Sequence, residues 1–205
     1  MPSLFPMFVK LEGKTVLVVG AGKVGEPKIH ALRDTGAHIR VVARVASPAV
    51  REWAQLGAIT LEEREFVDSD LDRVFLAVVA TSSRQLNQRI YHAAQARRVL
   101  CNVVDVPELC DFYYPAVVRR GDLQLAISTA GQSPALAQKI RRQLEKQYGP
   151  GYAAWVAELG ETRRKILASD LDPERKRALL LSLASPEAFE AAAAGLVPAG
   201  KGHSA

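Results

Sequence analysis

The sequence predicts an α/β protein with a doubly wound parallel sheet, a small α+β segment and a helical C-terminal region. Three observations carry this prediction. A glycine-rich turn follows the first apolar, β-branched run. Strand-like runs then alternate with helix-like stretches up to residue 115, which is typical of a parallel sheet between helices. Beyond residue 115 a hairpin pattern and then helical stretches replace the alternation.

The first strand, Thr15–Val19, leads directly into Gly20, Gly22 and Gly25. This spacing has a physical cause. The first glycine turns the chain out of the strand, the second lets backbone approach a pyrophosphate, and the third lets the next helix pack on the sheet. The N-terminus of that helix offers N–H groups to the anion, and Pro27 is tolerated in its first turn. The pattern predicts a dinucleotide site of the Rossmann type.

The remaining elements of the α/β region follow in order. The first helix ends before Gly36, and the second is N-capped by Ser47, has Pro48 at its first position and ends at Gly57. The third helix spans Arg84–Arg98. The four further strands are expected at 38–43, 59–62, 74–80 and 99–104.

Polar residues follow two of these strands, at the edge where open α/β sheets bind ligands. Thr81, Ser82 and Ser83 are expected to cap the third helix, and the first two could also contact a cofactor. Asp105 could accept a proton from a substrate whose hydride leaves to a nicotinamide, or it could merely organise the turn before Pro107. The histidines are expected to be structural or solvated: His30, His38, His92 and His203.

The end of the second strand bears on the choice of cofactor. NAD-binding folds commonly place an acidic residue there to hold the ribose hydroxyls, whereas this chain has Arg44. An arginine suggests a 2′-phosphate and therefore NADP. It could equally flank the adenosine, so this residue leaves both cofactors open.

Beyond Pro115, Ala116–Arg119 and Leu123–Ser128 are predicted to form a hairpin, and Ser133 then caps a helix. The apolar stripe of that helix consists of Leu136, Ile140, Leu144 and Tyr148. This segment is too small to bury its own faces, so we expect it to form a dimer contact.

The rest of the chain reads as helical, with a break at Asp172-Pro173 and a frayed tail from Ala191. We therefore expect three parts. A dinucleotide-binding domain occupies 1–115, a dimerisation segment 116–149, and a C-terminal helical domain 150–205.

The composition, with 48% apolar and 24% charged residues, is that of an ordinary globular protein. No apolar run reaches the roughly 18 residues of a membrane span, and the first residues lack the pattern of a secretory signal. Cys101 and Cys110 form neither a CxxC pair nor a metal-ligand pattern. We expect buried thiols, no metal site and a cytoplasmic protein.

The net charge of +5 is unevenly distributed. Residues 115–148 hold six basic and two acidic residues, a charge of +4, while residues 150–205 hold seven of each. A solvated helix face, a nucleic-acid patch and a site for a polyanionic small molecule all fit this charge. Nucleic acid is not expected, because the segment lacks interleaved aromatics and a recognisable binding module.

Three motifs in order, GAGKVG at 20–25, CNVVDVPE at 101–108 and STAGQSPALA at 128–137, resemble the precorrin-2 dehydrogenase family. The opening LFPMFVKLEGK also fits, and the resemblance covers residues 3–150. The family includes the amino-terminal module of siroheme synthase and bifunctional dehydrogenase/ferrochelatases. The resemblance implies a homodimer that oxidises precorrin-2 to sirohydrochlorin with NAD⁺, a step towards sirohaem.

The resemblance also implies roles for particular residues. Asp105 matches the essential aspartate for proton removal, and Thr129 matches a serine that one branch carries phosphorylated. Lys23-Val24 and Arg44-Val45 match positions that line the NAD site, so NAD is preferred. The expected cofactor-binding residues are Gly20, Gly22, Lys23, Val24, Gly25, Arg44, Val45, Thr81 and Ser82. The residues expected to bind the carboxylate-rich tetrapyrrole are Asn102, Arg119, Arg120, Ser128, Thr129, Gly131, Ser133, Lys139 and Arg142.

Two alternatives stay open. Bifunctional relatives suggest insertion of Fe²⁺ or Co²⁺ into sirohydrochlorin, alone or in addition. A Rossmann unit with a dimerising segment also allows an NAD(H)-sensing regulatory module, which would leave Asp105 unexplained. A methyltransferase module, as in the fused siroheme synthase, is not expected.

Overall fold

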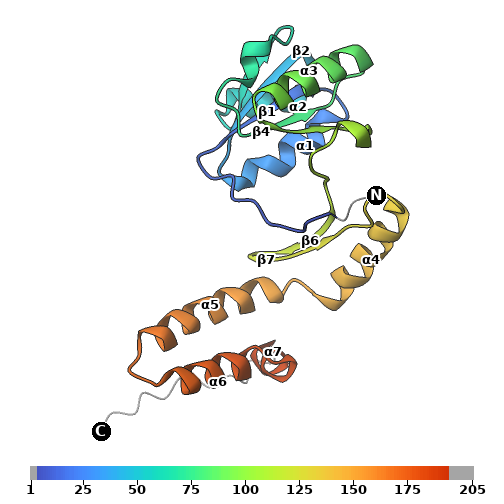
Figure 1. The fold of residues 1–205 in the computed structure, drawn as a ribbon. Helices are drawn as coiled ribbons and strands as arrows, with labels where there is room; N and C mark the ends of the chain where they lie inside the picture. Colours follow the sequence, from blue (N-terminus) through green and yellow to red (C-terminus); the bar gives the residue numbers. More distant parts are fainter. Residues whose placement is uncertain (1–3, 194–205) are drawn as a thin grey trace. The chain divides into compact units, whose positions relative to one another are not determined.

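The computed structural model describes residues 4–193, and the chain divides into two compact units at Tyr114/Pro115. Figure 1 shows the elements of both units in chain order. The further division predicted at residue 149 stays a prediction. The tail predicted from Ala191 is helical as far as Ala193; its remainder, including His203, lies outside the described residues.

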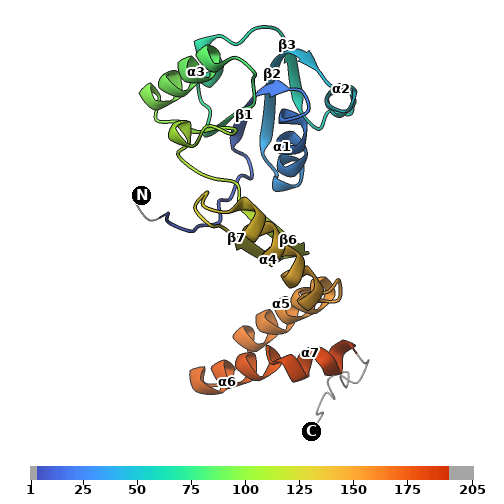
Figure 2. The same ribbon diagram turned by 90° about the vertical axis from the view of Figure 1, so that its right-hand side faces the viewer.

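The first unit contains a five-stranded parallel sheet in the order β3-β2-β1-β4-β5. Helices α1 (Gly25–Leu32) and α2 (Pro48–Gln55) cover one face, and α3 (Arg84–Ala96) covers the other (Figure 2). The predicted doubly wound α/β fold is therefore confirmed. The strands are β1 (Thr15–Ala21), β2 (His38–Ala46), β3 (Thr60–Glu63), β4 (Leu76–Val79) and β5 (Leu100–Val103). Three 3₁₀ turns of this unit lie at Arg33–Thr35, Asp68–Leu71 and Pro107–Leu109.

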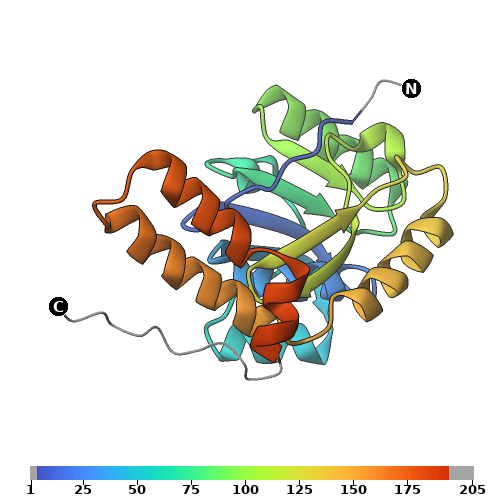
Figure 3. The same ribbon diagram turned by 90° about the horizontal axis from the view of Figure 1, so that it is seen from below.

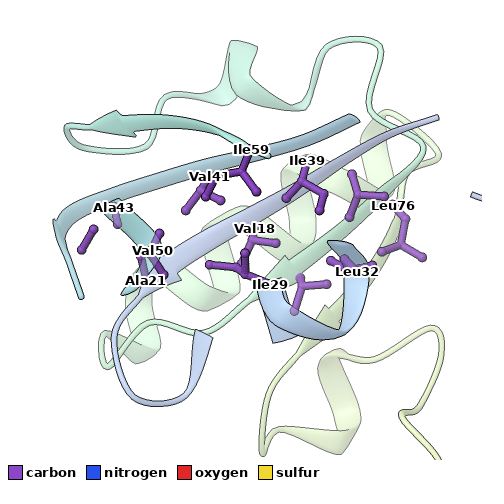
Figure 4. Close-up of a cluster of buried hydrophobic side chains, with 13 residues drawn as sticks. Val18, Ala21, Ile29, Leu32, Ile39, Val41, Ala43, Val50, Ile59 and Leu76 are labelled. Carbon is purple, nitrogen blue, oxygen red and sulfur yellow. The ribbon is translucent and has the colours of Figure 1, made fainter. Parts of the chain in front are cut away.

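Two buried layers hold the helices to the sheet, because successive residues of a strand point to opposite faces. On one face, Val18 of β1 packs in a cluster with Ile29 of α1 and Val50 of α2 (Figure 4). On the other face, Leu17 belongs to a cluster with Ile90 of α3. All five side chains are fully buried, so the strand ends that carry polar residues rest on a rigid core.

The strand that leads into the glycine turn is longer than predicted, but Gly20 and Gly25 are required for the predicted reasons. Strand β1 continues to Ala21, because Ala21 still pairs with Ala46 after an irregularity in the register. Gly20 has a φ of +100°, and a Cβ there would overlap the carbonyl oxygen of Ala80. A Cβ at Gly25 would overlap the carbonyl oxygen of Gly20. Both positions therefore require glycine.

The second unit begins with the predicted antiparallel hairpin, β6 (Ala116–Arg120) and β7 (Leu123–Ile127), on which α4 (Pro134–Gln147) packs. Helices α5 (Tyr152–Ala168) and α6 (Pro173–Leu183) lie side by side (Figure 3) and are followed by α7 (Pro186–Ala193). The predicted helix breaks are thus confirmed.

Side-chain caps start helices in both units. The capping oxygen accepts a hydrogen bond from the backbone N–H three residues later. The capping residues are Ser47, Ser83, Ser133, Asp172 and Ser185.

The apolar stripe predicted for α4 is only partly covered within the second unit. Leu136 is 48% exposed, whereas Ala137 is the buried residue of this helix. Residues four apart drift by about 40° around a helix, so the three steps from Leu136 to Tyr148 turn the stripe by about 120° and one partner cannot cover all of it. The other three residues of the stripe, Ile140, Leu144 and Tyr148, are half-buried.

Candidate functional site

The first unit has a cleft of about 820 Å³ at the carboxyl ends of its strands. Open α/β sheets bind ligands at this edge, where the strand order reverses. The lining residues include the sequence-predicted set Gly20, Gly22, Lys23, Val24, Arg44, Val45, Thr81, Ser82 and Asp105. Gly25 lies beneath this set, packed against Gly20. The fold thus brings together residues that are up to 85 positions apart in the sequence.

The turn between β1 and α1 has the features that a pyrophosphate requires. Nothing lies within 4 Å of a Cβ built at Gly22, so this side of the turn opens into the cleft. No side chain caps the N-terminus of α1 at Val24. The Glu26 N–H already donates to the Gly22 carbonyl oxygen at 2.9 Å, and Pro27 has no N–H. The N–H groups left for an anion at this helix start are those of Val24 and Gly25. A dinucleotide therefore fits the residues present.

Asp105 follows β5 at the cleft, exposed and with a φ of +63°. Aspartate adopts this left-handed conformation more readily than most residues, but it still costs free energy. None of the described residues donates a hydrogen bond to its carboxylate or forms an ion pair with it. The carboxylate makes no bond within the turn, so its oxygens are free to meet a ligand in the cleft.

Side chains beyond Asp105 hold its turn in place. The Cys110 thiol lies 3.1 Å from the Val103 carbonyl oxygen and 3.3 Å from that of Val106, so it bridges both ends of the turn. The buried Asn102 amide donates to Cys110 Sγ at 3.3 Å and to the Phe112 carbonyl at 2.7 Å. Asn102, predicted to bind substrate, is therefore committed to this scaffold and does not line the cleft.

The two cysteines differ in burial. Cys101 is fully buried, and burial raises the pKa of its thiol to about 12. Cys110 is half-buried, which corrects the expectation that both thiols are buried. Burial raises the pKa of Cys110 as well, so both thiols are held protonated near neutral pH.

The turn after β4 presents its polar groups to the cleft. The Thr81 hydroxyl donates to Asn87 Oδ1 at 2.6 Å and accepts from the Ser83 N–H. Ser83 caps α3, as predicted, and Ser82 lines the cleft beside Thr81. Of these three neighbouring residues, Ser83 caps the helix, and Thr81 and Ser82 are the predicted cofactor contacts that line the cleft.

At the end of β2, Arg44 and Val45 are exposed at the cleft. Arg44 makes no hydrogen bond or ion pair with the described residues, so its guanidinium donors are free. The carboxylate that lies near the end of this strand belongs to Glu63, which accepts from the Ala46 N–H and from Arg51. Hydrogen bonds from Arg51 and Ala46 hold the pKa of Glu63 below its ordinary value.

Sequence reasoning missed a further wall of the cleft. It comes from the turn after β3 and from α3, and consists of Arg64, Glu65, Phe66, Leu86 and Arg89. The rule that ligands bind beyond the strand ends could have found the turn after β3. The α3 residues depend on how that helix packs, which no motif marks.

Arg64 in this wall belongs to a network of ion pairs. It contacts Glu62 and Asp70 at 2.6 Å, and Arg40 contacts the same two carboxylates at 3.3 and 3.5 Å. Burial would raise the pKa of Asp70. Hydrogen bonds from Arg64 and the Val67 N–H, with the charges of Arg64 and Arg40, outweigh burial and lower this pKa.

The predicted substrate-binding residues of the second unit divide into two groups. Arg120 donates to the carbonyls of Tyr148, Glu145 and Arg119, which commits its guanidinium to the end of α4. By contrast, other members are exposed and make no side-chain hydrogen bond or ion pair with described residues. These are Arg119, Lys139 and Arg142.

The STAGQSP loop between β7 and α4 is held by its own hydroxyls. Ser128 Oγ accepts from the Ala130 N–H, Thr129 Oγ1 from the Ser133 N–H, and Ser133 Oγ from the Leu136 N–H. Ala130 and Gly131 both have a positive φ. Each of these hydroxyls keeps a proton that it can donate to an acceptor.

Within residues 4–193, no helix is long and apolar enough to cross a bilayer. The same residues contain no group of three or more histidine, cysteine or carboxylate side chains placed to hold a metal ion.

Comparison with known proteins agrees with these features. A family model described as "Putative NAD(P)-binding" matches residues 7–116, and one described as "Sirohaem biosynthesis protein central" matches residues 120–147. The chain is 43% identical over 140 residues to siroheme synthases of Escherichia coli O139:H28 and Shigella boydii serotype 18. The match covers 68% of this chain and 31% of each relative, so the chain spans about a third of their length.

The solved structure of SirC, precorrin-2 dehydrogenase, matches with a TM-score of 0.79 and 29% identity. The match covers 91% of this chain and 92% of that chain. The resemblance that the three motifs indicate is thus confirmed in sequence and in fold.

Proposed function

The chain belongs to the NAD(P)-binding family whose model covers residues 7–116, and from this premise we propose that it oxidises precorrin-2 to sirohydrochlorin with NAD⁺. The observation that carries the proposal is the unpaired Asp105 carboxylate at the cleft of a dinucleotide-binding fold. The similarity to SirC, precorrin-2 dehydrogenase, over nearly the whole chain supports the choice of substrate.

The cofactor is proposed to extend across the strand ends. Its pyrophosphate binds the Gly20–Gly25 turn and the N-terminus of α1. The adenosine lies on the side of β2 and β3, and the nicotinamide on the side of β4 and β5, near Thr81, Ser82 and Asp105. The nicotinamide, when bound, supplies the acceptor for a hydride.

Asp105 is proposed as the proton acceptor. Loss of a hydride and a proton from precorrin-2 removes two hydrogen atoms and extends the conjugation of the macrocycle. An exposed carboxylate without a cationic partner can accept that proton without first breaking a bond. The turn held by Cys110 fixes the position of this carboxylate.

The substrate is proposed to bind through cations and hydroxyl donors of the second unit. The free guanidinium and ammonium groups of Arg119, Lys139 and Arg142 complement its carboxylates. The hydroxyls of the STAGQSP loop can donate to the same groups. Asn102 and Arg120 are not assigned to the substrate, because their donors are taken up within the fold.

NAD is proposed as the cofactor although Arg44 is basic. Lys23-Val24 and Arg44-Val45 match the positions that line the NAD site of precorrin-2 dehydrogenases. We assign Arg44 to the flank of the adenosine. A dissociation constant for NADP⁺ at or below that for NAD⁺ would reverse this assignment.

A cytoplasmic homodimer is proposed as the active form. The second unit exposes several large apolar side chains, among them Val117, Leu136 and Leu181. Burial of such groups favours association. Sedimentation of the purified protein measures the oligomeric state.

The test of function follows NADH absorbance with precorrin-2 and NAD⁺. Wild-type protein is expected to form NADH, and Asp105→Asn to lower kcat by at least about 100-fold, the range for loss of a general base. The dissociation constant for NAD⁺ should stay within about twofold, because Asp105 is not assigned to cofactor binding.

Asp122→Asn, at an exposed aspartate of the second unit, is the matched control and should keep wild-type turnover. Absence of NADH with authentic substrate would contradict the proposed reaction. Binding of NAD⁺ without turnover would favour the sensor alternative. Full activity in Asp105→Asn would remove the role of this carboxylate only.

A further inference from the structure

Arg64, in the turn after β3, has an unusual set of contacts for a cationic side chain at a cleft. Its Nε–H donates to Glu62 Oε2 at 3.0 Å. One terminal nitrogen donates to the Glu65 carbonyl at 2.9 Å and to Asp70 Oδ2 at 2.8 Å. The other donates to Glu62 Oε2 and Asp70 Oδ1, each at 2.6 Å. These five bonds match the five N–H donors of a guanidinium.

This saturation limits what Arg64 can offer to a ligand. All five donors lie in the plane of the guanidinium and point at protein oxygens, so none is left for a phosphate or a hydroxyl. The two flat faces of the group remain. A guanidinium face attracts a flat, electron-rich ring through stacking and cation–π contact. Since Arg64 lines the cleft and its side chain is 37% exposed, a face is accessible to a ligand.

The structure assigns to Arg64 a base-stacking role: we propose that the adenine ring of the dinucleotide lies on the guanidinium face of Arg64. The inference rests on the proposed function and deepens it by naming the adenine subsite. The position agrees with the topology, because β3 and β5 form opposite edges of the sheet. With the nicotinamide near Asp105 after β5, the adenine lies towards the turn after β3.

The surroundings hold the stacking surface in one orientation. Asp70 is only 2% exposed and accepts from both terminal nitrogens of Arg64, which fixes the plane of the guanidinium. Arg40 supplies a second cation to Asp70 from the strand below. The stacking face is therefore preorganised and loses little conformational entropy when a base binds.

Arg44 makes a useful contrast in the same cleft. Its donors are free, so Arg44 can bind a phosphate or ribose oxygen, whereas Arg64 cannot. Arg44 would thus donate hydrogen bonds to the ribose or a phosphate through its N–H groups, whereas Arg64 would stack on the adenine through the flat face of its guanidinium.

The experiment compares Arg64→Lys with Arg40→Lys by calorimetric titration. Both variants keep a positive charge beside Glu62 and Asp70, but Arg40 does not line the cleft. The probes are NAD⁺, ADP-ribose and reduced nicotinamide mononucleotide. Arg64→Lys should weaken NAD⁺ and ADP-ribose about tenfold, a typical loss for a stacked base, and leave the mononucleotide unchanged. Arg40→Lys should change none of the three beyond about twofold.

A second measurement uses wild-type protein and does not depend on a variant that folds. Addition of ADP-ribose should shift the Arg64 Nε–H proton resonance upfield, because a stacked ring shields a group above its face. The mononucleotide should leave this resonance in place. Equal loss in Arg40→Lys, unchanged affinity in Arg64→Lys or absence of the upfield shift would overturn the stacking proposal. Failure of wild-type protein to bind NAD⁺ would instead overturn the proposed function.

Discussion

The two units of this chain bury their apolar residues to very different extents. In the first unit, every strand of the sheet except β3 contributes fully buried side chains, among them Val16, Val41, Val78 and Val103. Among the described residues of the second unit, Val118 and Ala137 are buried. The first unit therefore has the core that a domain needs to fold alone, and the second does not.

This difference corresponds to different tasks. The cleft of the first unit needs strand ends held at fixed distances, and a dense core supplies that rigidity. The second unit presents free cations and exposed apolar side chains, the features on which the proposed substrate binding and the proposed dimer rest. The cleft of the first unit thus rests on a core of its own, whereas the exposed apolar side chains of the second unit are not covered by any of the described residues.

The largest expected effect is on the packing of the first unit. Gly25→Ala places a Cβ onto the Gly20 carbonyl, which is backbone and cannot move aside. We expect a loss of about 3 kcal/mol or more in the free energy of unfolding, measured with urea. Gly149→Ala in the second unit meets nothing within 4 Å and should change this free energy by less than about 0.5 kcal/mol.

Gly22→Ala separates folding from binding within the same turn. A Cβ at this position also meets nothing within 4 Å, so the variant should fold normally and bind NAD⁺ more weakly. Equal stability of Gly25→Ala and wild type would show that the first unit tolerates an extra Cβ at its turn. The proposed difference in packing between the two units would then be contradicted.

The next effect concerns association through the second unit. Val117 of β6 is 37% exposed whereas the next residue, Val118, is buried, so Val117 lies on the more exposed face of the β6–β7 hairpin. Val117→Lys should raise the dimer dissociation constant about 100-fold in sedimentation experiments, because a charge would have to lose its hydration in the interface. Leu56→Lys, at a position 71% exposed in the first unit, is the control and should leave the dimer intact. An unchanged dimer in Val117→Lys would place the interface elsewhere.

The smallest effect compares the ion pairs of the two units. Asp70→Asn removes a buried acceptor of Arg64 and should cost about 2 kcal/mol of unfolding free energy at pH 7. Glu145→Gln removes an i,i+4 pair with Arg141 on α4 and should cost only about 0.5 kcal/mol.

The pH dependence of that cost follows from the lowered pKa of Asp70 in the folded state. The carboxylate stabilises the fold fully above its unfolded pKa, near 3.8, and this contribution is lost as the pH falls through the lower folded value. The difference between wild type and Asp70→Asn should therefore shrink below about pH 3.8. A difference that stays constant down to pH 2 would mean that Asp70 acts by shape and not by charge.

Much of the fold and part of the site could be predicted from local patterns. The glycine spacing, the alternation of strands and helices and the serine caps depend on neighbours in the sequence, and all are confirmed. The sequence did not show that Leu136 of the α4 stripe is exposed and Ala137 buried, because the buried face of a short helix depends on the partner that it packs against. Asn102 and Arg120 carry donors that suit a ligand, yet partners that no motif marks, 10 residues away for Asn102 and 28 for Arg120, take up those donors.

The sequence alone determined the βαβ order, the glycine turn and the presence of a carboxylate after β5, since each follows from local backbone and side-chain chemistry. Only the tertiary structure decided which donors stay free. Arg44 and Arg64 both lie near or just after the end of a strand, but Glu62, Glu65 and Asp70 take up every donor of Arg64 and none of Arg44. Hydrogen-bond partners are set by distances across the fold, and those distances exist only once the strands have packed.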